Sequence, residues 1–369
     1  MKIGVLTSSR ADFGIYFSLL DKIRKDSFFE LEIIAFGTHL KEEFGYTINE
    51  IEQQGFTVNH KIETSTQNDF PEDISCSIGK TIISFSRFWS DTKFDLVLAF
   101  GDRYEMYAAV VAASPFNIDI AHIHAGETTL GAIDNAYRHS ISLLSKYLFV
   151  TTDEYKNRAQ HILGKSENVF NVGALSIDNL MRQEFFTKDE FLEEFDINID
   201  IPSILCTFHP ETVNYEKNEE YIDELINTFE SLKKEYQIII TMPNSDTMGN
   251  MIRKKINEFC KGENQVKVIE SFGMKGYLTC MKYCVFLLGN TSSGFVEAAF
   301  FPKWVINLGK RQDGRIITEN IINSAISKES ILLALNDIKN RTLKEDINIY
   351  GNGKASEKII STIKHIYNG

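Results

Sequence analysis

Residues 284–315 have the sequence CVFLLGNTSSGFVEAAFFPKWVINLGKRQDGR, which joins an apolar run, a turn of small residues and a helical pattern. The run 285–288 predicts a buried strand, and the turn Gly-Asn-Thr-Ser-Ser-Gly at 289–294 predicts a break before a helix at 295–300. A strand that leads through such a turn into a helix presents backbone N–H groups to an anion. This stretch therefore predicts a strand–helix unit that can hold a phosphate group.

A second turn of the same kind lies near the N-terminus. An apolar run at 3–6 leads into Thr-Ser-Ser-Arg-Ala-Asp-Phe-Gly at 7–14 and then into a helical pattern. One phosphate-binding turn in each half predicts a nucleotide diphosphate held between two domains. No strand is followed by Gly-x-Gly-x-x-Gly, so we expect neither a dinucleotide cofactor nor sugar oxidation by nicotinamide.

Length and composition restrict the class of protein. The chain has 369 residues, enough for two domains, and it is 43% hydrophobic and 24% charged, which is typical of soluble globular proteins. No apolar run is long enough to span a membrane, and a net charge of −12 argues against a nucleic-acid partner. The five cysteines include no Cys-x-x-Cys pair, so we expect buried free thiols in a cytoplasmic protein.

Strand-like runs alternate with helical patterns in both halves, which predicts βαβ units and parallel sheets. The runs lie at 3–6, 31–36, 96–100, 118–123, 147–150, 169–172, 203–207, 237–241, 266–269, 285–288 and 304–307. The charged segment 184–202 lacks strand character, and we expect the linker there. The predicted domains are residues 1–185 and 200–352, with a C-terminal helix in 353–369 that packs back across the junction.

Polar residues follow the predicted strands of the first half. Asp102, in Gly-Asp-Arg, comes directly after the run 96–100, where functional groups gather in open α/β sheets, although an N-cap role is equally consistent with this position. The next run ends in His122-Ile-His124-Ala-Gly-Glu127. Two His residues two apart share a strand face and could bind zinc with Glu127. No further ligand stands at a diagnostic spacing, so we expect a metal-free polar site with Glu127 as the better catalytic candidate.

Further candidate site residues each have an ordinary structural role as the alternative. Asp134 and Arg138 would share a helix face, and an ordinary exposed ion pair is the alternative. In the second half, the loops that follow strands contain His209, Asn244 and Asp246. Glu297 could accept hydrogen bonds from ribose hydroxyls, or it could be an acidic residue that the helix dipole stabilises in the first turn. Arg311 and Arg315 could bind a diphosphate or be ordinary solvated side chains.

The ordered set of motifs resembles a known family, the hydrolysing UDP-N-acetylglucosamine 2-epimerases of sialic-acid-type sugar biosynthesis. The resemblance spans nearly the whole chain, and the set is specific although each motif alone is weak. The motifs are Arg10-Ala-Asp12, Gly37-Thr-His39, Gly101-Asp102-Arg103, His122-x-His124-Ala-Gly-Glu127, Gly131-Ala-Ile-Asp134 with Arg138-His139, His209-Pro210, Pro243-Asn244-x-Asp246, Gly289-Asn290-Thr291-Ser292-Ser293-Gly294-x-x-Glu297 and Arg311-Gln-x-Gly-Arg315. Some members have Glu at the position of His124, and Ser is common at that of Thr291.

The resemblance implies a fold of two Rossmann-like domains, similar to glycosyltransferase-B, with the active site in the interdomain cleft. It implies release of UDP with inversion at sugar carbon 2 (C2), no metal, no redox cofactor, and a homo-oligomer, a dimer or tetramer. The substrate is UDP-N-acetylglucosamine or, in a close relative, UDP-2,4-diacetamido-2,4,6-trideoxyglucose (UDP-N,N'-diacetylbacillosamine) on the way to legionaminic-type acids. No residue in the sequence decides between these sugars.

The chemistry requires a cradle for the departing diphosphate and acid/base groups beside C2. We assign the cradle to Arg10, His209 and the turn Thr291–Gly294, and the acid/base work to Asp102, Glu127 and Asp134, with His209 also a catalytic candidate. Other expected substrate-binding residues are Asp12, His39, Arg103, His124, Arg138, Asn244, Asp246, Gly289, Asn290, Glu297 and Arg311. A glycosyltransferase and a catalytically silent nucleotide-sugar-binding protein are the alternatives.

Overall fold

The computed structural model describes residues 1–64, 70–164, 166–213, 215–243, 248–344 and 347–368. The chain forms two compact units. The first comprises Met1–Glu127, Asp134–Met181 and Tyr350–Gly369, and the second comprises Thr128–Ile133 and Arg182–Ile349. The short segment Thr128–Ile133 thus belongs to the second unit, while the residues on either side of it, Glu127 and Asp134, belong to the first.

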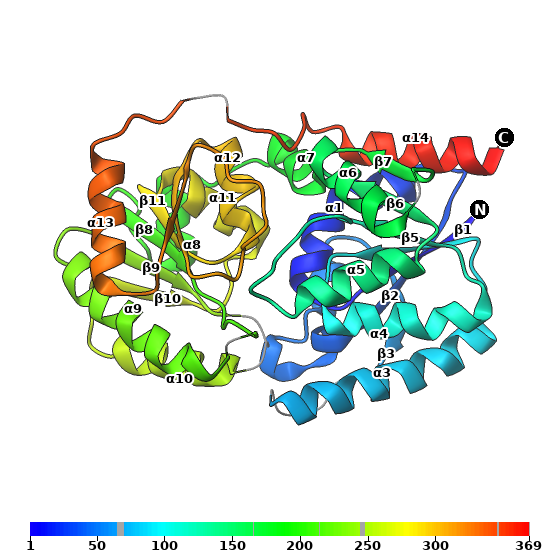
Figure 1. The fold of residues 1–369 in the computed structure, drawn as a ribbon, viewed down its shortest axis with the longest axis horizontal. Coiled ribbons are helices and arrows are strands. Elements are labelled where there is room, and N and C mark those ends of the chain that lie inside the picture. The colour runs from blue at the N-terminus through cyan, green and yellow to red at the C-terminus, as the bar shows by residue number, and fades with distance from the viewer. Residues whose placement is uncertain (65–69, 165, 214, 244–247, 345–346, 369) are drawn as a thin grey trace. The chain divides into compact units, whose positions relative to one another are not determined.

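The first unit is built on a seven-stranded parallel sheet (Figure 1) with the strand order β3-β2-β1-β4-β5-β6-β7. Its central strands show little alternation of apolar and polar residues and are almost wholly apolar, as is typical of strands covered by helices on both faces. The strands are β1 (Lys2–Thr7), β2 (Glu30–Phe36), β3 (Val58–Ile62), β4 (Leu96–Phe100), β5 (Ile120–Ile123), β6 (Tyr147–Val150) and β7 (Val169–Asn171).

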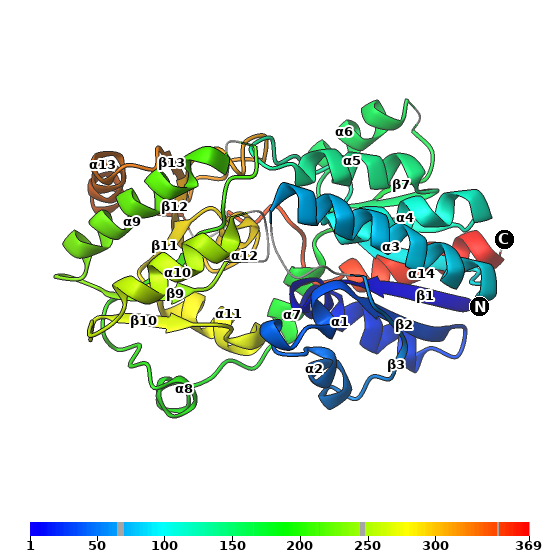
Figure 2. The same ribbon diagram turned by 90° about the horizontal axis from the view of Figure 1, so that it is seen from below.

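Helices cover both faces of this sheet, and Figure 2 shows α1 and α2 on one side and α3 and α4 on the other. One core contains side chains of α1 (Arg10–Lys25), α2 (Ile48–Gln53), α7 (Leu175–Arg182) and α14 (Ala355–Asn368). The opposite core contains side chains of α3 (Pro71–Asp91), α4 (Tyr104–Ala113) and α5 (Asp134–Leu144). The remaining helical elements are α6 (Asp153–Leu163), η1 (Gly37–Leu40), η2 (Glu42–Phe44) and η3 (Ser114–Phe116).

The C-terminal helix α14 is fixed to the first unit by a buried carboxylate. Asp178 of α7 accepts hydrogen bonds from the backbone N–H groups of Ala355 (2.8 Å) and Ser356 (2.7 Å) and from the Ser356 hydroxyl. These donors lie in the first turn of α14, whose N–H groups have no partner within the helix. Ile359 and Ile363 then pack beside α1, so the end of the chain completes the first core.

The second unit repeats the design with a six-stranded parallel sheet of order β10-β9-β8-β11-β12-β13. Helices α9, α10 and α13 cover one face, and α8, α11 and α12 cover the other. The strands are β8 (Ser203–Thr207), β9 (Gln237–Thr241), β10 (Val266–Ile269), β11 (Phe286–Gly289), β12 (Trp304–Leu308) and β13 (Ile321–Ser324). The helices are α8 (Lys188–Phe195), η4 (Tyr215–Lys217), α9 (Asn218–Leu232), α10 (Gly249–Phe259), α11 (Gly273–Tyr283), η5 (Ser292–Gly294), α12 (Glu297–Phe300) and α13 (Lys328–Lys339).

The two parallel sheets confirm the predicted pair of Rossmann-like folds. Segment 184–202, where we expected the linker, contains α8, and Phe191 of that helix is fully buried in the second core. The edge strands β3 and β13 and the helix α3 were not predicted. Cys206, Cys280 and Cys284 are buried free thiols as expected, whereas Cys76 is exposed. None of the described helices combines the length and apolarity of a membrane span.

Candidate functional site

The predicted site residues gather where each sheet changes its winding direction. In the first unit β1 lies between β2 and β4, and in the second unit β8 lies between β9 and β11. Loops that leave neighbouring strands in opposite directions open a crevice at this point, which is where open α/β sheets bind ligands. Arg10 and Asp12 lie in the first turn of α1, directly after the loop that follows β1, and the loop after β4 contains Asp102 and Arg103. The loops after β8 and β11 contain His209 and the turn at 290–294.

Arg138 of α5 joins the candidate residues of the first unit. Its side chain is only 3% exposed, and its guanidinium donates through Nη2 to Asp102 Oδ2 and through Nη1 to the His124 carbonyl oxygen (2.9 Å). The same Nη1 lies 3.7 Å from Glu127 Oε2. The exposed Asp134–Arg138 pair that we considered as an alternative is therefore wrong, because Arg138 is buried and its carboxylate partners among the described residues are Asp102 and Glu127.

Asp102 is not the helix cap that its sequence position also allowed. The N-cap of α4 is Arg103, and no side chain caps this helix. The Asp102 side chain is instead 23% exposed and paired with Arg138, so one carboxylate is both fixed in orientation and open to a ligand. Asp134, at the start of α5, lies close enough to Tyr137 that its charge, second to burial, helps to raise the pKa of that phenol.

Glu127 and His124 form a close pair at the carboxyl end of β5. His124 Nδ1 lies 3.0 Å from Glu127 Oε1, and the hydroxyl of Thr151 donates to the same oxygen (3.3 Å). Both side chains are buried, with Glu127 1% and His124 8% exposed. The His124 ring packs against Phe100, the last residue of β4, at a centroid distance of 4.8 Å. The pair is thus held between two strand ends of the first sheet.

His122 is a structural residue of the core rather than a metal ligand, because both of its ring nitrogens are hydrogen-bonded within the protein. Its Nε2 donates to the Gly101 carbonyl oxygen (2.8 Å), and its Nδ1 accepts from the Ser142 hydroxyl (2.9 Å). Burial, aided by the charge of Arg138, lowers the pKa of His122 to about 3. Both ring nitrogens are hydrogen-bonded, so His122 ties β5 to the loop after β4 and to α5.

The loop after β1 is organised by the buried carboxylate of Asp12. It accepts hydrogen bonds from the N–H groups of Ser8 (2.8 Å) and Ser9 (3.1 Å) and from the Thr7 hydroxyl (2.7 Å). Burial alone would raise the pKa of Asp12, but the His39 imidazole and the hydrogen bonds from Thr7 and Ser8 lower it below its usual range. This network shapes the loop between β1 and α1, and Arg10 is the first residue after that loop.

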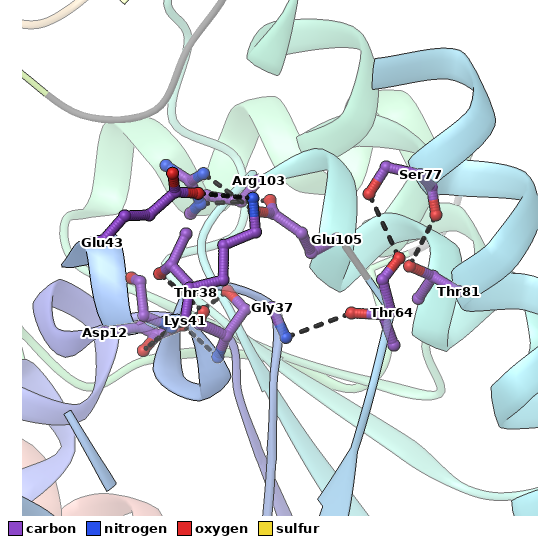
Figure 3. A network of polar contacts seen from close by, with 12 residues as sticks. Asp12, Gly37, Thr38, Lys41, Glu43, Thr64, Ser77, Thr81, Arg103 and Glu105 are labelled. Atoms are coloured by element: carbon purple, nitrogen blue, oxygen red, sulfur yellow. Dashed lines mark hydrogen bonds and ion pairs between the residues drawn. The ribbon is translucent and has the colours of Figure 1, made fainter. Parts of the chain in front are cut away.

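Further polar contacts hold η1 and the start of α4 beside this loop (Figure 3). His39 lies between Thr7 and Thr47, with ring nitrogens 2.9 and 2.7 Å from their hydroxyl oxygens. Arg103 donates two hydrogen bonds to the carboxylate of Glu105 (3.1 and 2.9 Å). The Arg10 side chain lies 3.9 Å from Glu50 and is 36% exposed. It is therefore more accessible than the Arg103 side chain, which is 17% exposed.

In the second unit Asn290 connects the loops that follow β8 and β11. Its side chain is fully buried, accepts from the His209 N–H (2.7 Å) and donates to the His209 carbonyl oxygen (2.8 Å). Gly289 allows this contact, because a Cβ there would lie 2.0 Å from the Thr207 carbonyl oxygen. Asn290 therefore orients the His209 backbone from within the protein.

The hydroxyl-rich turn after β11 contains η5. The N–H groups of Gly294, Phe295 and Val296 bond back to Thr291 and Ser292 carbonyls within the turn. Ser293 Oγ lies 2.6 Å from the Tyr277 hydroxyl and 3.3 Å from Thr291 Oγ1, while Ser292 is exposed. The helix that follows, α12, has only four residues, so the polar groups at this position are mainly those of the turn itself.

The segment Thr128–Ile133 packs against the loop after β12. Leu130 N–H donates to the Asp313 carbonyl oxygen (2.8 Å), and a Cβ on Gly131 would lie 2.1 Å from the Lys310 carbonyl oxygen. Arg311, in that loop, is buried and donates to the Pro210 carbonyl oxygen (2.6 Å), and Arg315 is buried and donates to Gln312 (2.6 Å). Neither arginine is a simple solvated side chain.

Sequence reasoning missed several residues of these networks. Tyr277 lies on a helix far from the turn in sequence, and Glu211 accepts from the Lys310 N–H (2.7 Å) across two loops. The only sequence signal for Glu211 was its place just after a predicted strand. Asn244 and Asp246 lie outside the described residues. Glu297 begins α12 and remains a candidate ribose ligand.

Comparison with known proteins matches this chain over nearly its whole length. A family model described as UDP-N-acetylglucosamine 2-epimerase matches residues 21–364. A Legionella pneumophila protein named UDP-N,N'-diacetylbacillosamine 2-epimerase (hydrolyzing) is 33% identical over 99% of this chain and 96% of that protein. A Campylobacter jejuni protein named GDP/UDP-N,N'-diacetylbacillosamine 2-epimerase (hydrolyzing) is 35% identical over 88% of this chain and 85% of that protein.

The fold is also that of solved structures. The UDP-GlcNAc 2-epimerase from Neisseria meningitidis, solved with UDP-GlcNAc bound, superimposes with a TM-score of 0.85 at 20% identity. The match covers 99% of this chain and 100% of that one. This likeness confirms the predicted fold of two Rossmann-like domains of the glycosyltransferase-B-like class.

We expect His122 to make the folded protein sensitive to acid. The unfolded chain protonates this His below about pH 6.5, while the folded chain keeps it neutral down to about pH 3, so folding free energy is lost as the pH falls through that window. Between pH 7 and 5, the free energy of unfolding measured with urea should fall by about 1–2 kcal/mol less in His122→Asn than in the wild type. The exposed His161, changed to Asn, should leave the wild-type pH dependence intact; an identical slope in His122→Asn would contradict the account.

Proposed function

Because the chain belongs to the UDP-N-acetylglucosamine 2-epimerase family, we propose that it is a hydrolysing 2-epimerase acting on a UDP-activated 2-acetamido sugar. The observation that carries the proposal is the buried cluster of Arg138 with Asp102, Glu127 and His124 at the ends of β4 and β5. A protein that only bound an anionic nucleotide would gain nothing from carboxylates in such a position. The cluster favours proton transfer and thus an enzyme over a silent binding protein.

The reaction follows from the acidity of the sugar. The proton on C2 is barely acidic, since no carbonyl group adjoins it. Departure of UDP from carbon 1 (C1) gives that carbon oxocarbenium character and acidifies the C2 proton. Loss of the proton then gives a glycal, and addition of water, with the hydroxyl going to C1 and a proton to C2 from the opposite face, gives the epimer. The sugar is released free, in the manno configuration.

The residues divide between the units by chemistry. We assign the departing diphosphate to Arg10 of the first unit and to His209 and the turn Thr291–Gly294 of the second. Hydrogen-bond donors and cations placed where negative charge develops are usually the largest contribution to such a reaction. Asp102, Glu127 and Asp134 are the acid/base candidates, and neighbouring carboxylates hold their protons differently, so that one can act as base while another acts as acid.

We propose UDP-N,N'-diacetylbacillosamine as the substrate. Two relatives that carry this sugar in their names are 33% and 35% identical to the chain over 99% and 88% of its length. UDP-N-acetylglucosamine is the second candidate, because the matching family model carries that name. The two sugars differ at carbons 4 and 6, away from the bond that breaks, so the same cluster serves either of them.

The two substrates can be compared directly in deuterated water. We expect UDP and a free manno-configured sugar bearing deuterium at C2, observed by NMR, with kcat/KM at least about tenfold higher for UDP-N,N'-diacetylbacillosamine, since a buried polar partner left without its substrate group is costly. Faster turnover of UDP-N-acetylglucosamine would assign the second substrate. Product without solvent deuterium would exclude the elimination. Slow UDP release without C2 exchange would favour a glycosyltransferase.

Asp102→Asn should reduce turnover by about 10²–10⁴-fold, because the amide cannot accept or deliver the proton. UDP affinity, measured by calorimetry, should stay nearly unchanged, since Asp102 is not assigned to the diphosphate. Asp91→Asn, at an exposed position in the same unit, is the control and should keep full activity. Wild-type turnover in Asp102→Asn, or loss of UDP binding together with folding, would contradict the assigned role.

A further inference from the structure

Two nitrogens of the candidate site, His124 Nε2 and Arg138 Nε, are buried without a hydrogen-bond partner among the described residues, and only the imidazole nitrogen can accept a proton. His124 Nε2 is inaccessible and has no partner among the residues that the structure describes. The other ring nitrogen, Nδ1, is 3.0 Å from the Glu127 carboxylate. A buried polar atom normally has a partner, and leaving one without costs about 1–3 kcal/mol. An atom of this kind, on a ring whose other nitrogen is paired with a carboxylate, suggests a group that meets its partner only when substrate is bound.

The pairing with Glu127 determines which nitrogen of the neutral ring carries the proton. An ionised carboxylate only accepts hydrogen bonds, so the ring must donate to it through Nδ1–H. The remaining nitrogen, Nε2, then has a free lone pair. The buried, unpartnered nitrogen of His124 is thus the one that faces away from the Glu127 carboxylate.

The backbone at His124 is consistent with a functional constraint. His124 has φ of +64°, in the left-handed region that non-glycine residues seldom adopt. Arg138 Nη1 donates to its carbonyl oxygen, and Phe100 packs on its ring. The Arg138 hydrogen bond to the His124 backbone, the packing of Phe100 on the ring and the contact of Nδ1 with Glu127 therefore hold the ring in one orientation in spite of the unfavourable φ.

We propose that His124 Nε2 is the base that removes the C2 proton, with Glu127 as its positioning residue. This assignment rests on the proposed function, and it moves the base from a carboxylate to the imidazole. In the step, the C2–H bond breaks and its proton goes to Nε2, the C1–C2 double bond forms, and the C1–O bond breaks with its electron pair leaving on UDP. The ring becomes an imidazolium ion whose Nδ1–H remains on Glu127.

The charges around the ring suit this step. The Glu127 carboxylate lies 3.0 Å from the ring, and the Arg138 guanidinium bonds to the His124 backbone and lies 3.7 Å from Glu127. Asp102 neutralises Arg138 from the other side. His122, on the same strand, stays neutral because burial lowers its pKa to about 3, so it adds no positive charge at neutral pH.

The test uses the full chain with His124→Asn, because Asn tolerates a left-handed backbone and offers no basic nitrogen. With UDP-N,N'-diacetylbacillosamine or UDP-N-acetylglucosamine in deuterated water, UDP release and C2 deuteration should both fall by about 10²-fold or more. Calorimetric UDP affinity should remain within about threefold of the wild type. The control His161→Asn, at an exposed position in the same unit, should turn over at the wild-type rate.

Two outcomes of this experiment would overturn the proposal. Turnover of His124→Asn within a few-fold of the wild type would mean that the imidazole transfers no proton. Release of UDP at the wild-type rate with accumulation of the glycal would place His124 in the hydration step instead. Failure of the wild-type protein to turn over either sugar would refute the proposed function itself, and so the two failures are distinguishable.

A spectroscopic measurement tests the positioning role without depending on activity. In wild-type protein labelled with ¹⁵N-histidine, NMR should show the His124 proton on Nδ1. Glu127→Ala should abolish this fixed tautomer and reduce turnover while UDP affinity is kept, a combination that a purely structural role would not give. A His124 proton found on Nε2 in the wild-type protein would overturn the assignment.

Discussion

The candidate site of the first unit depends on one buried guanidinium. Arg138 is almost fully enclosed, and a buried charge is tolerated only when it is paired and hydrogen-bonded. Its donors reach a carboxylate after β4 and a backbone carbonyl after β5, so the loops that follow two neighbouring strands are fixed by a residue of α5. Without the Asp102 carboxylate, Arg138 would keep Glu127, at 3.7 Å, as its carboxylate partner among the described residues. The same constraint therefore both stabilises this part of the fold and orients Asp102, Glu127 and His124.

The second unit reaches a similar result with neutral groups. Asn290 bonds both to the N–H and to the carbonyl of His209, and Gln312 donates to the Asn290 carbonyl oxygen (2.8 Å). Three loops at the carboxyl end of that sheet are thereby joined. The glycine at 289 and the short turn after it place small hydroxyl residues beside this junction. In both units the parallel sheet brings the loops together, and buried polar pairs decide their final geometry.

The sequence predicted what depends on local pattern. The apolar runs of the central strands have the bounds expected within a residue or two, and polar residues that follow β4, β5, β8 and β11 lie in the expected loops. What it could not predict depends on residues distant in the chain. Asp102 and Arg138 are 36 positions apart in the chain. Arg138 pairs with Asp102 rather than with Asp134, four positions earlier on the same helix, because the side chain of Arg138 is buried. The edge strand β3 has weak apolar alternation, so it was missed. The N-cap role that was one of two alternatives for Asp102 falls instead on Arg103.

We propose that this protein breaks the bond between C1 of the sugar and the oxygen that bridges to the β-phosphorus of UDP, so that the C2 proton can be removed. A UDP-sugar labelled with ¹⁸O in the oxygen that bridges C1 and the β-phosphorus tests this claim most directly. After turnover in ordinary water, mass spectrometry should find the label in the released UDP and not in the free sugar. Recovery of ¹⁸O in the sugar would show that the oxygen–phosphorus bond breaks, and it would contradict the account.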